Sequence, residues 1–292
     1  MLAIVGTVPD LKVDLVEGKA SGSAERLTIN QQKFPVHRGT PALIGAAIQV
    51  MSAFDGPGIT GFLAGDIGLG HGSRKLYHHL VHTADLSGIN ILVFHYLQPD
   101  VDWHNKVLFR IQDLAVQPIM IADAGFMYAA KMSGQSAAYD LFTPDAGELA
   151  FLADETAPHP FYTRGFILHT DNRIPDLVAR AYTHNNAARY LLVKGAIDCI
   201  MDSSGLLSQV EGPSCEAMEA IGGTGDTLTG IVAALISMGM PIPQAAHAAA
   251  RINRLAGSMA DPTPATQIHE IIFHIPAAAK TVLGPDLLFQ QQ

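Results

Sequence analysis

A glycine-rich segment near residue 225 carries the strongest chemical signal in the sequence. Residues 221–230 read Ile-Gly-Gly-Thr-Gly-Asp-Thr-Leu-Thr-Gly, and an apolar stretch follows directly. We expect this stretch to be a helix, whose first N–H groups lack helical partners and favour a negative charge. Glycines also let an anion approach the backbone closely. Gly223, Thr224 and Gly225 are therefore predicted to form an anion hole for a phosphate group.

Asp226 directly follows this predicted anion hole. A carboxylate at that place can take a proton from a hydroxyl group while the hydroxyl attacks an arriving phosphoryl group. Aspartate is also an ordinary helix-capping residue, and an isolated Gly-Asp pair would favour that structural role. The surrounding glycines favour the chemical role, and Asp226 is our candidate catalytic base.

Three more polar residues are candidates for the same site. Lys194 ends a predicted strand, where it could bring positive charge to the phosphates of a nucleotide or face solvent. Alternatively, its backbone and that of Gly195 could line the pocket for adenine and ribose. Asp123 ends another predicted strand, the place where open α/β sheets put ligand-facing residues, although it could equally form a turn. Glu148 could hold Mg²⁺ through water, because this cation prefers oxygen ligands and keeps part of its hydration shell. An exposed glutamate in a first helical turn is the alternative.

A histidine pair with helical spacing is a weaker signal. His78 and His82 lie one turn apart on a predicted helix, with His79 between them. Zinc sites need three or four ligands, and no further ligand cluster is evident in the sequence. We expect these histidines to lie on a surface helix.

The scaffold that must position these residues is an alternation of strands and helices, which predicts a parallel sheet. Polar segments before residue 36 could form an edge hairpin, and residues 167–187 a strand or helix pair. Ser73 is a possible N-cap of the helix that follows the glycine-rich loop 65–72. Strands are expected at residues 2–8, 59–64, 90–96, 118–122, 141–143, 190–194, 198–202 and 206–210, the last three as a meander. Helices are expected at residues 40–53, 73–81, 103–114, 127–132, 227–238, 243–259 and 265–282, with one more from residue 147.

Composition restricts the class of protein. Of 292 residues, 48% are hydrophobic and 15% are charged, which indicates a well-packed body and a single domain over residues 1–292. The formal charge is −9 and the 18 Lys and Arg residues are scattered, which argues against nucleic-acid binding. Small-molecule chemistry fits better.

The compartment is also expected from the sequence. Two cysteines make no disulfide framework, the first ten residues lack a basic leader, and no apolar run approaches 18 residues. We expect a cytoplasmic protein with no membrane association, and a homo-oligomer.

Several motifs resemble those of a known superfamily. Gly223-Thr224-Gly225-Asp226 resembles the anion-hole and base motif of ribokinase-like enzymes. Residues 192–196, Leu-Val-Lys-Gly-Ala, resemble their nucleotide-contacting strand and turn, and residues 143–148, Thr-Pro-Asp-Ala-Gly-Glu, resemble a TPxxxE signature. The resemblance implies a three-layer α/β/α sandwich with a mainly parallel central sheet.

Within that superfamily the chain is most similar to the ADP- or ATP-dependent NAD(P)H-hydrate dehydratases, over residues 38–260. Their signatures include TPHPGE, LKGA and GSGDVLTG. Gly68-Leu69-Gly70 resembles the end of their GPGLG loop, and residues 38–47 resemble their N-terminal glycine and alanine segment. Asp145-Ala146 replaces the family's His-Pro, Asp66-Ile67 replaces Gly-Pro, and residues 122–125 are an imperfect DADALN segment. Residues 65–80 also resemble the GDxxG…L stretch of sugar kinases.

The resemblance implies a reaction and a site. The terminal phosphoryl group of ATP or ADP would pass to the hydroxyl of hydrated NADH or NADPH, with Asp226 as base and Mg²⁺ on the nucleotide, and phosphate elimination would restore the reduced dinucleotide. The implied nucleotide-binding residues are Lys194, Gly195, Ala196 and Gly225. The implied substrate-binding residues are Ala46, Gly70, Asp123, Asp145 and Asp226.

Two other functions stay open at this point. A small-molecule kinase acting on a vitamin precursor or a sugar would use the same base and anion hole, but would release a stable phosphorylated product. A nucleotide-binding protein without turnover is the second alternative, motivated by the substitutions at Asp145 and around Asp123. The glycine spacing between residues 65 and 72 does not fit a Rossmann dinucleotide loop, and no Walker lysine motif is present.

Overall fold

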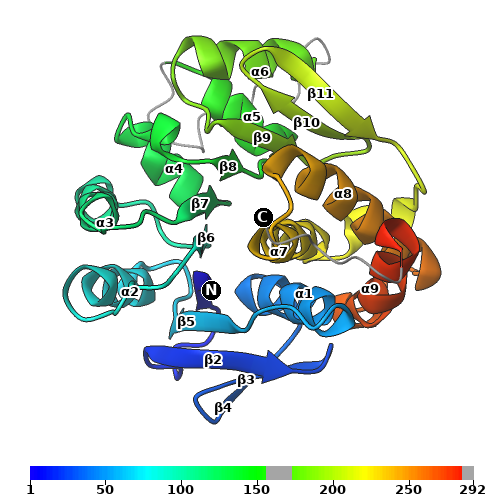
Figure 1. Ribbon diagram of the computed structural model, residues 1–292, viewed down its shortest axis with the longest axis horizontal. Helices are drawn as coiled ribbons and strands as arrows, with labels where there is room; N and C mark the ends of the chain where they lie inside the picture. The colour runs from blue at the N-terminus through cyan, green and yellow to red at the C-terminus, as the bar shows by residue number, and fades with distance from the viewer. Residues whose placement is uncertain (156–172, 285–292) are drawn as a thin grey trace.

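The computed structural model describes residues 1–155 and 173–284, and its central feature is an 11-stranded sheet of order β11-β10-β9-β8-β7-β6-β1-β5-β2-β3-β4 (Figure 1). The strands are β1 (Leu2–Val8), β2 (Val16–Gly22), β3 (Arg26–Ile29), β4 (Gln32–Pro35), β5 (Ile59–Gly65), β6 (Ile91–His95), β7 (Ile119–Ala122), β8 (Leu141–Phe142), β9 (Tyr190–Val193), β10 (Asp198–Asp202) and β11 (Gly205–Val210). The helices are α1 (Thr40–Ala53), α2 (His71–His82), α3 (Val101–Gln112), α4 (Gly125–Met132), α5 (Ala146–Ala153), α6 (Ile174–Thr183), α7 (Thr224–Ser237), α8 (Ile242–Met259) and α9 (Ile268–Leu283).

The centre of the sheet is parallel and its two edges are antiparallel. Strands β5, β1, β6, β7, β8 and β9 pair in parallel, and their carboxyl ends therefore meet at one edge. A β2–β3–β4 meander extends one side and a β9–β10–β11 meander the other. All seven residues of β1 are buried, as expected for a strand covered on both faces. The predicted edge hairpin and the predicted C-terminal meander are both confirmed.

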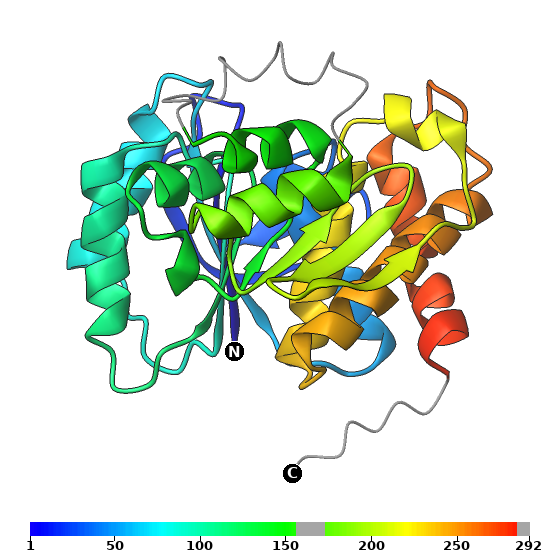
Figure 2. The same ribbon diagram turned by 90° about the horizontal axis from the view of Figure 1, so that it is seen from above.

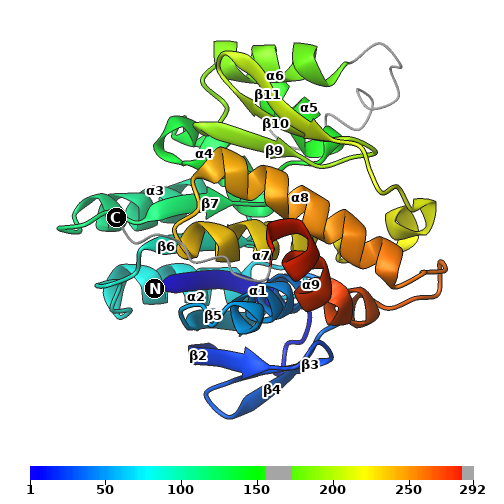
Figure 3. The same ribbon diagram turned by 45° about the vertical axis from the view of Figure 1, so that its right-hand side comes forward.

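Helices cover both faces of the sheet and create two separate hydrophobic cores, as the views in Figures 2 and 3 show. One core contains α1, α7, α8 and α9, and the other contains α2 to α6. The α/β sandwich with a mainly parallel central sheet is thereby confirmed. The extent of the domain, 1–292, stays a prediction.

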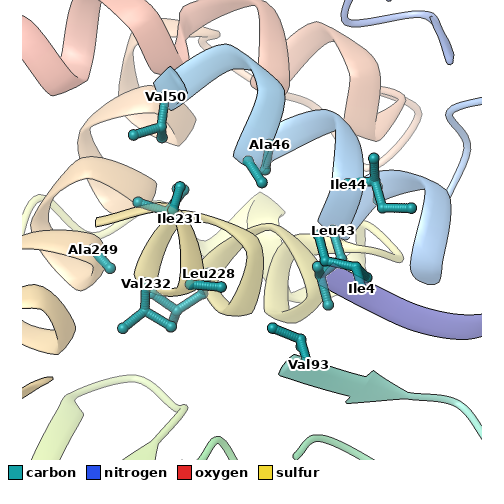
Figure 4. Packing of buried hydrophobic residues seen from close by; sticks show 14 of the residues in the cluster. Ile4, Leu43, Ile44, Ala46, Val50, Val93, Leu228, Ile231, Val232 and Ala249 are labelled. Carbon is teal, nitrogen blue, oxygen red and sulfur yellow. The ribbon is translucent and has the colours of Figure 1, made fainter. Parts of the chain in front are cut away.

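A glycine allows α1 and α7 to pack closely (Figure 4). A Cβ atom added at Gly230 would lie 2.1 Å from the carbonyl oxygen of Leu43, so only glycine fits at this crossing. Ala46 on α1 and Ile231 on α7 lie at the same interface (Figure 4). This close contact fixes the start of α1 relative to the start of α7, where the candidate base lies.

Some sequence-based boundaries were wrong. Helix α2 begins at His71 with Gly70 as its N-cap, and the Ser73 hydroxyl donates to Asp66 instead of capping the helix. Helix α7 begins at Thr224, three residues before the predicted start, because Gly223 adopts a left-handed conformation (φ 109°) and is the N-cap. Only part of the expected element at 167–187 lies within the described residues, and that part is helical.

In the described part of the chain, no helix combines the length and the apolar character that a membrane crossing needs.

Candidate functional site

The candidate site lies where the parallel strands end. His95 is the last residue of β6, Asp123 follows β7, and Lys194 follows β9. Helix α7 begins beside these strand ends, and its first turn carries Asp226. In open α/β sheets this edge is where ligands bind. The sheet therefore brings together residues that are up to 131 positions apart in the chain.

Asp226 is a buried carboxylate in the first turn of α7, and both of its oxygens accept a hydrogen bond. Oδ2 accepts from the Gly39 N–H at 2.6 Å, and Oδ1 lies 3.0 Å from Nε2 of His95. Burial alone would raise the pKa of Asp226. The hydrogen bond from His95, the charge of Lys194 and the Gly39 N–H outweigh burial and hold the pKa below its ordinary value. Asp226 is thus ionised and able to accept a proton.

The predicted anion hole, Gly223 to Gly225, lies at the amino end of α7. Gly223 caps α7 without a side-chain hydrogen bond, so the first N–H groups of this helix are not consumed by a capping side chain. Within the described residues, the N–H groups of Thr224, Gly225 and Asp226 donate to no protein acceptor. Gly222 to Gly225 are partly or fully exposed, so an anion can reach these donors.

Asp123 and Lys194 form a nearly buried ion pair. The Lys194 ammonium lies 3.0 and 3.1 Å from the two carboxylate oxygens of Asp123. Burial would lower the pKa of Lys194, but the charges of Asp123 and Glu148 outweigh it and raise that pKa. A Cβ atom at Gly225 would lie 3.5 Å from Nζ, so the ammonium also borders the anion hole. Both predicted residues therefore join the site, with Lys194 already paired.

A hydroxyl chain supports Asp123 from the core. Thr229 of α7 donates to Oδ2 of Asp123 at 2.7 Å, and the Thr143 hydroxyl lies 2.9 Å from that of Thr229. Thr143 is the first residue of the TPxxxE segment. Its hydroxyl fixes that of Thr229, and thereby the carboxylate of Asp123.

His95, Asp123 and Asp226 place three possible ligand atoms within 4.8 Å of one another. The ammonium of Lys194 already neutralises Asp123, and His95 is hydrogen-bonded directly to Asp226. A dication at this point would have to displace or repel that ammonium. We interpret the three residues as part of a cluster of two polar pairs, His95 with Asp226 and Asp123 with Lys194, and not as a metal site.

Glu148 lies beside this cluster on α5. Its Oε2 accepts from the Asp145 N–H at 2.9 Å, and its Oε1 accepts from the Tyr128 hydroxyl at 3.1 Å. Burial raises the pKa of Glu148 to about 8, with the charge of Lys194 opposing and the charges of Asp123 and Asp145 adding to the shift. Asp145, which is exposed, accepts from the Glu148 N–H in a reciprocal capping box.

The remaining predicted residues are Ala46, Gly70, Gly195 and Ala196. Ala46 is fully buried in the core between α1 and α7 and does not join the cluster. Gly70 lies on the loop after β5, where its N–H donates to the carboxylate of Asp66. The carbonyls of Gly195 and Ala196 each accept from the guanidinium of Arg254 at 2.9 Å, so α8 fixes this turn.

Sequence reasoning missed several residues. His95 contacts Asp226 directly, and Thr40 contacts it indirectly through His95. Arg254 fixes the predicted nucleotide turn also through its contact with Asp198. Tyr96 is half-exposed beside the site with its ring against that of His95, and has a positive φ of 52°. The one usable signal was position: His95 and Tyr96 are the last two residues of a predicted strand, and Asp123 follows the neighbouring predicted strand.

Comparisons with known proteins identify the family. A family model described as NAD(P)H-hydrate dehydratase matches residues 99–276, more than half of the chain. This match includes Asp123, Glu148, Lys194 and Asp226, and begins after Gly70. The expected resemblance of residues 38–70 to the family therefore stays a prediction.

Two curated relatives are similar to the chain in sequence. The chain is 40% identical to the uncharacterized protein MJ1337 of Methanocaldococcus jannaschii over 242 residues, which are 82% of this chain and 100% of that protein. It is 32% identical to the bifunctional NAD(P)H-hydrate repair enzyme Nnr of Pyrobaculum aerophilum over 176 residues. That second match covers 59% of this chain and only 30% of the repair enzyme.

Solved structures share the fold. A ribokinase-like superfamily protein from Enterococcus faecalis superposes with a TM-score of 0.59 at 13% identity, covering 97% of this chain and 87% of that one. The pyridoxal kinase of Staphylococcus aureus, in complex with AMP-PCP and pyridoxal, gives 0.51 at 13% identity, covering 87% and 86%. At such identities the likeness concerns the fold, which is ribokinase-like as the motifs predicted. By its sequence match, the chain belongs to the NAD(P)H-hydrate dehydratase family.

Proposed function

We propose that this chain is a lyase that repairs hydrated NADH or NADPH at the expense of ATP or ADP. The observation that carries the proposal is the position of Asp226, an ionised and buried carboxylate one residue from unpaired helix N–H groups. A phosphoryl group held by those N–H groups lies within reach of a hydroxyl that Asp226 can deprotonate.

The reaction balances with these groups alone. The hydroxyl oxygen of the hydrated ring attacks the terminal phosphorus, the bond to the bridging oxygen breaks, and Asp226 takes the hydroxyl proton. The phosphate then leaves with the electron pair of its bond to the ring carbon and takes up the proton lost from the neighbouring ring carbon, which restores the ring double bond. The N–H groups of Thr224 and Gly225 stabilise the charge on the transferred group, and Lys194 adds positive charge at its edge.

The nucleotide is proposed to bind along Lys194, Gly195, Ala196 and Gly225. The Arg254 guanidinium keeps the 195–196 turn in place through two carbonyls. The hydrated nicotinamide is proposed to lie near Asp123 and Asp145, on the side of the strand ends.

The site also fits Mg²⁺ on the nucleotide. Glu148 and Asp145 present oxygen donors, the type that this cation prefers. Burial, and then the crowding of Glu148 with the charges of Asp123 and Asp145, raises the pKa of Glu148. A hydrated cation near Glu148 would relieve that crowding. Mg²⁺ would neutralise charge on the phosphate oxygens.

The test is an absorbance assay at the reduced-nicotinamide band, with hydrated NADH, Mg²⁺ and either ATP or ADP. Nucleotide-dependent recovery of absorbance supports the proposal and names the phosphoryl donor. Asp226→Asn should cut turnover by several orders of magnitude and leave nucleotide affinity nearly unchanged, and unimpaired turnover in this variant would remove Asp226 as the base.

A small-molecule kinase is the second candidate, favoured by the fold shared with pyridoxal kinase and by Asp145 in place of the family's histidine. It predicts nucleotide consumption with a stable phosphorylated product and no recovery of absorbance. Nucleotide binding with neither outcome would point to a protein without turnover.

A further inference from the structure

His95 connects the start of α1 to the candidate base. It is fully buried at the end of β6, and both of its ring nitrogens are engaged. Nδ1 lies 3.0 Å from the hydroxyl of Thr40, and Nε2 lies 3.0 Å from Oδ1 of Asp226. Thr40 is itself fully buried, so water does not compete for either contact.

The partners of the ring decide which nitrogen carries the proton. An ionised carboxylate only accepts hydrogen bonds, so Nε2 must donate to Asp226. A neutral ring then leaves Nδ1 as an acceptor for the hydroxyl proton of Thr40. The same carboxylate accepts the Gly39 N–H on its other oxygen, so two donors from opposite sides determine its plane.

We propose that His95 is the positioning residue of Asp226, holding one carboxylate oxygen through Nε2–H while Thr40 fixes the ring in that tautomer. Its effect on turnover rests on the proposed function of Asp226 as base. His95 and Thr40 lie outside the 99–276 segment that matches the family, and Asp226 lies within it.

The surroundings of Asp226 set the expected direction of any pH effect. The titratable or charged groups near it are His95 and Tyr96 from the end of β6, Asp123 after β7, Glu148 on α5 and Lys194 after β9. Without the His95 hydrogen bond, only the charge of Lys194 and the Gly39 N–H oppose the effect of burial on the pKa of Asp226. The pKa of Asp226 therefore rises, and its basic form is lost at a higher pH.

The kinetic test compares His95→Leu with His95→Gln. The amide nitrogen of Gln lies as many bonds from the backbone as Nε2, so Gln keeps a donor to Asp226 while Leu does not. Because a hydrogen bond to a charged group is worth about 1.5–3 kcal/mol, His95→Leu should lower kcat by about 10- to 100-fold. It should also move the acidic limb of kcat/KM to higher pH, and His95→Gln should restore most of both.

A purely structural role predicts something else. His95→Leu would then lower Tm, with kcat per folded molecule and the pH profile unchanged, and Gln would give no rescue. That result overturns the proposal. Nucleotide affinity, measured by calorimetry for all variants, identifies any loss caused by misfolding.

A second test does not depend on any substrate. ¹⁵N NMR of the His95 imidazole should show the proton on Nε2 in the wild type. In Asp226→Asn the obligate Gly39 donor must face the Asn oxygen, so the Asn NH₂ faces His95 and the proton should move to Nδ1. A proton on Nδ1 in the wild type, or no change in the variant, refutes the arrangement. If the wild type fails to repair hydrated NADH yet shows this tautomer switch, the proposed function fails and the positioning by His95 stands.

Discussion

The ion pair between Asp123 and Lys194 makes a sharp prediction about stability. Side-chain exposure is 2% for Asp123 and 13% for Lys194, so each charge depends on the other. Removing one partner of a buried pair typically costs about 3–5 kcal/mol, because the other charge stays buried without compensation. We expect Asp123→Asn and Lys194→Met each to lower the free energy of unfolding by an amount near the lower end of that range, because Lys194 is not fully covered.

The double variant should lose less than the sum of the single losses. Once both charges are gone, no uncompensated charge remains, so a coupling of about 1–3 kcal/mol is expected for residues in direct contact. Lys106 and Asp102 provide the matched control, since their ion pair of 2.6 Å on α3 is largely exposed. Asp102→Asn should leave stability close to that of the wild type.

Urea unfolding followed by circular dichroism and by fluorescence of Trp103 provides the measurement, with coincident transitions as the requirement for a two-state analysis. Losses below about 1 kcal/mol for both single variants, or additive losses within about 0.5 kcal/mol, would refute the reasoning. Either result would mean that water reaches the pair and screens its charges.

Two further predictions concern the packing and the pH response. Gly230→Ala should lower the free energy of unfolding by about 1–3 kcal/mol, because its Cβ would meet the backbone of Leu43. A change of side-chain rotamer cannot relieve this contact, so the backbone of one helix has to shift. Thermal unfolding checks this, with Gly58→Ala, whose Cβ would meet only the flexible end of Lys19, as a control that should stay near the wild type. Glu148 has a pKa raised to about 8, so the folded state holds its proton more tightly than the unfolded state, and its contribution to stability is lost as pH rises toward 8. Urea unfolding at several pH values should therefore show a smaller fall in stability between pH 5 and pH 9 for Glu148→Gln than for the wild type, and parallel curves would contradict the raised pKa.

The sequence by itself determined the local elements and much of the anion hole. A glycine run that opens an apolar helix has one physical consequence, unpaired N–H groups in a small volume, and this needs no tertiary information. Alternation of strands and helices likewise predicted a parallel sheet, and it put Asp123 and Lys194 at the ends of two predicted strands. These features depend on periodicity and on residues close together in the chain.

Only the tertiary structure decided which groups contact one another. His95 lies 131 residues from Asp226 and Gly39 lies 187 residues from it, and no local pattern states that they share one carboxylate. The same holds for Lys194, which pairs with Asp123 although its type alone suggested a free charge for phosphate. Ala46, expected at the substrate, is buried because α1 presents it to α7 at the close crossing over Gly230. The local sequence decides which face of each helix or strand is apolar. The position of one element relative to another is set by packing over the whole sheet.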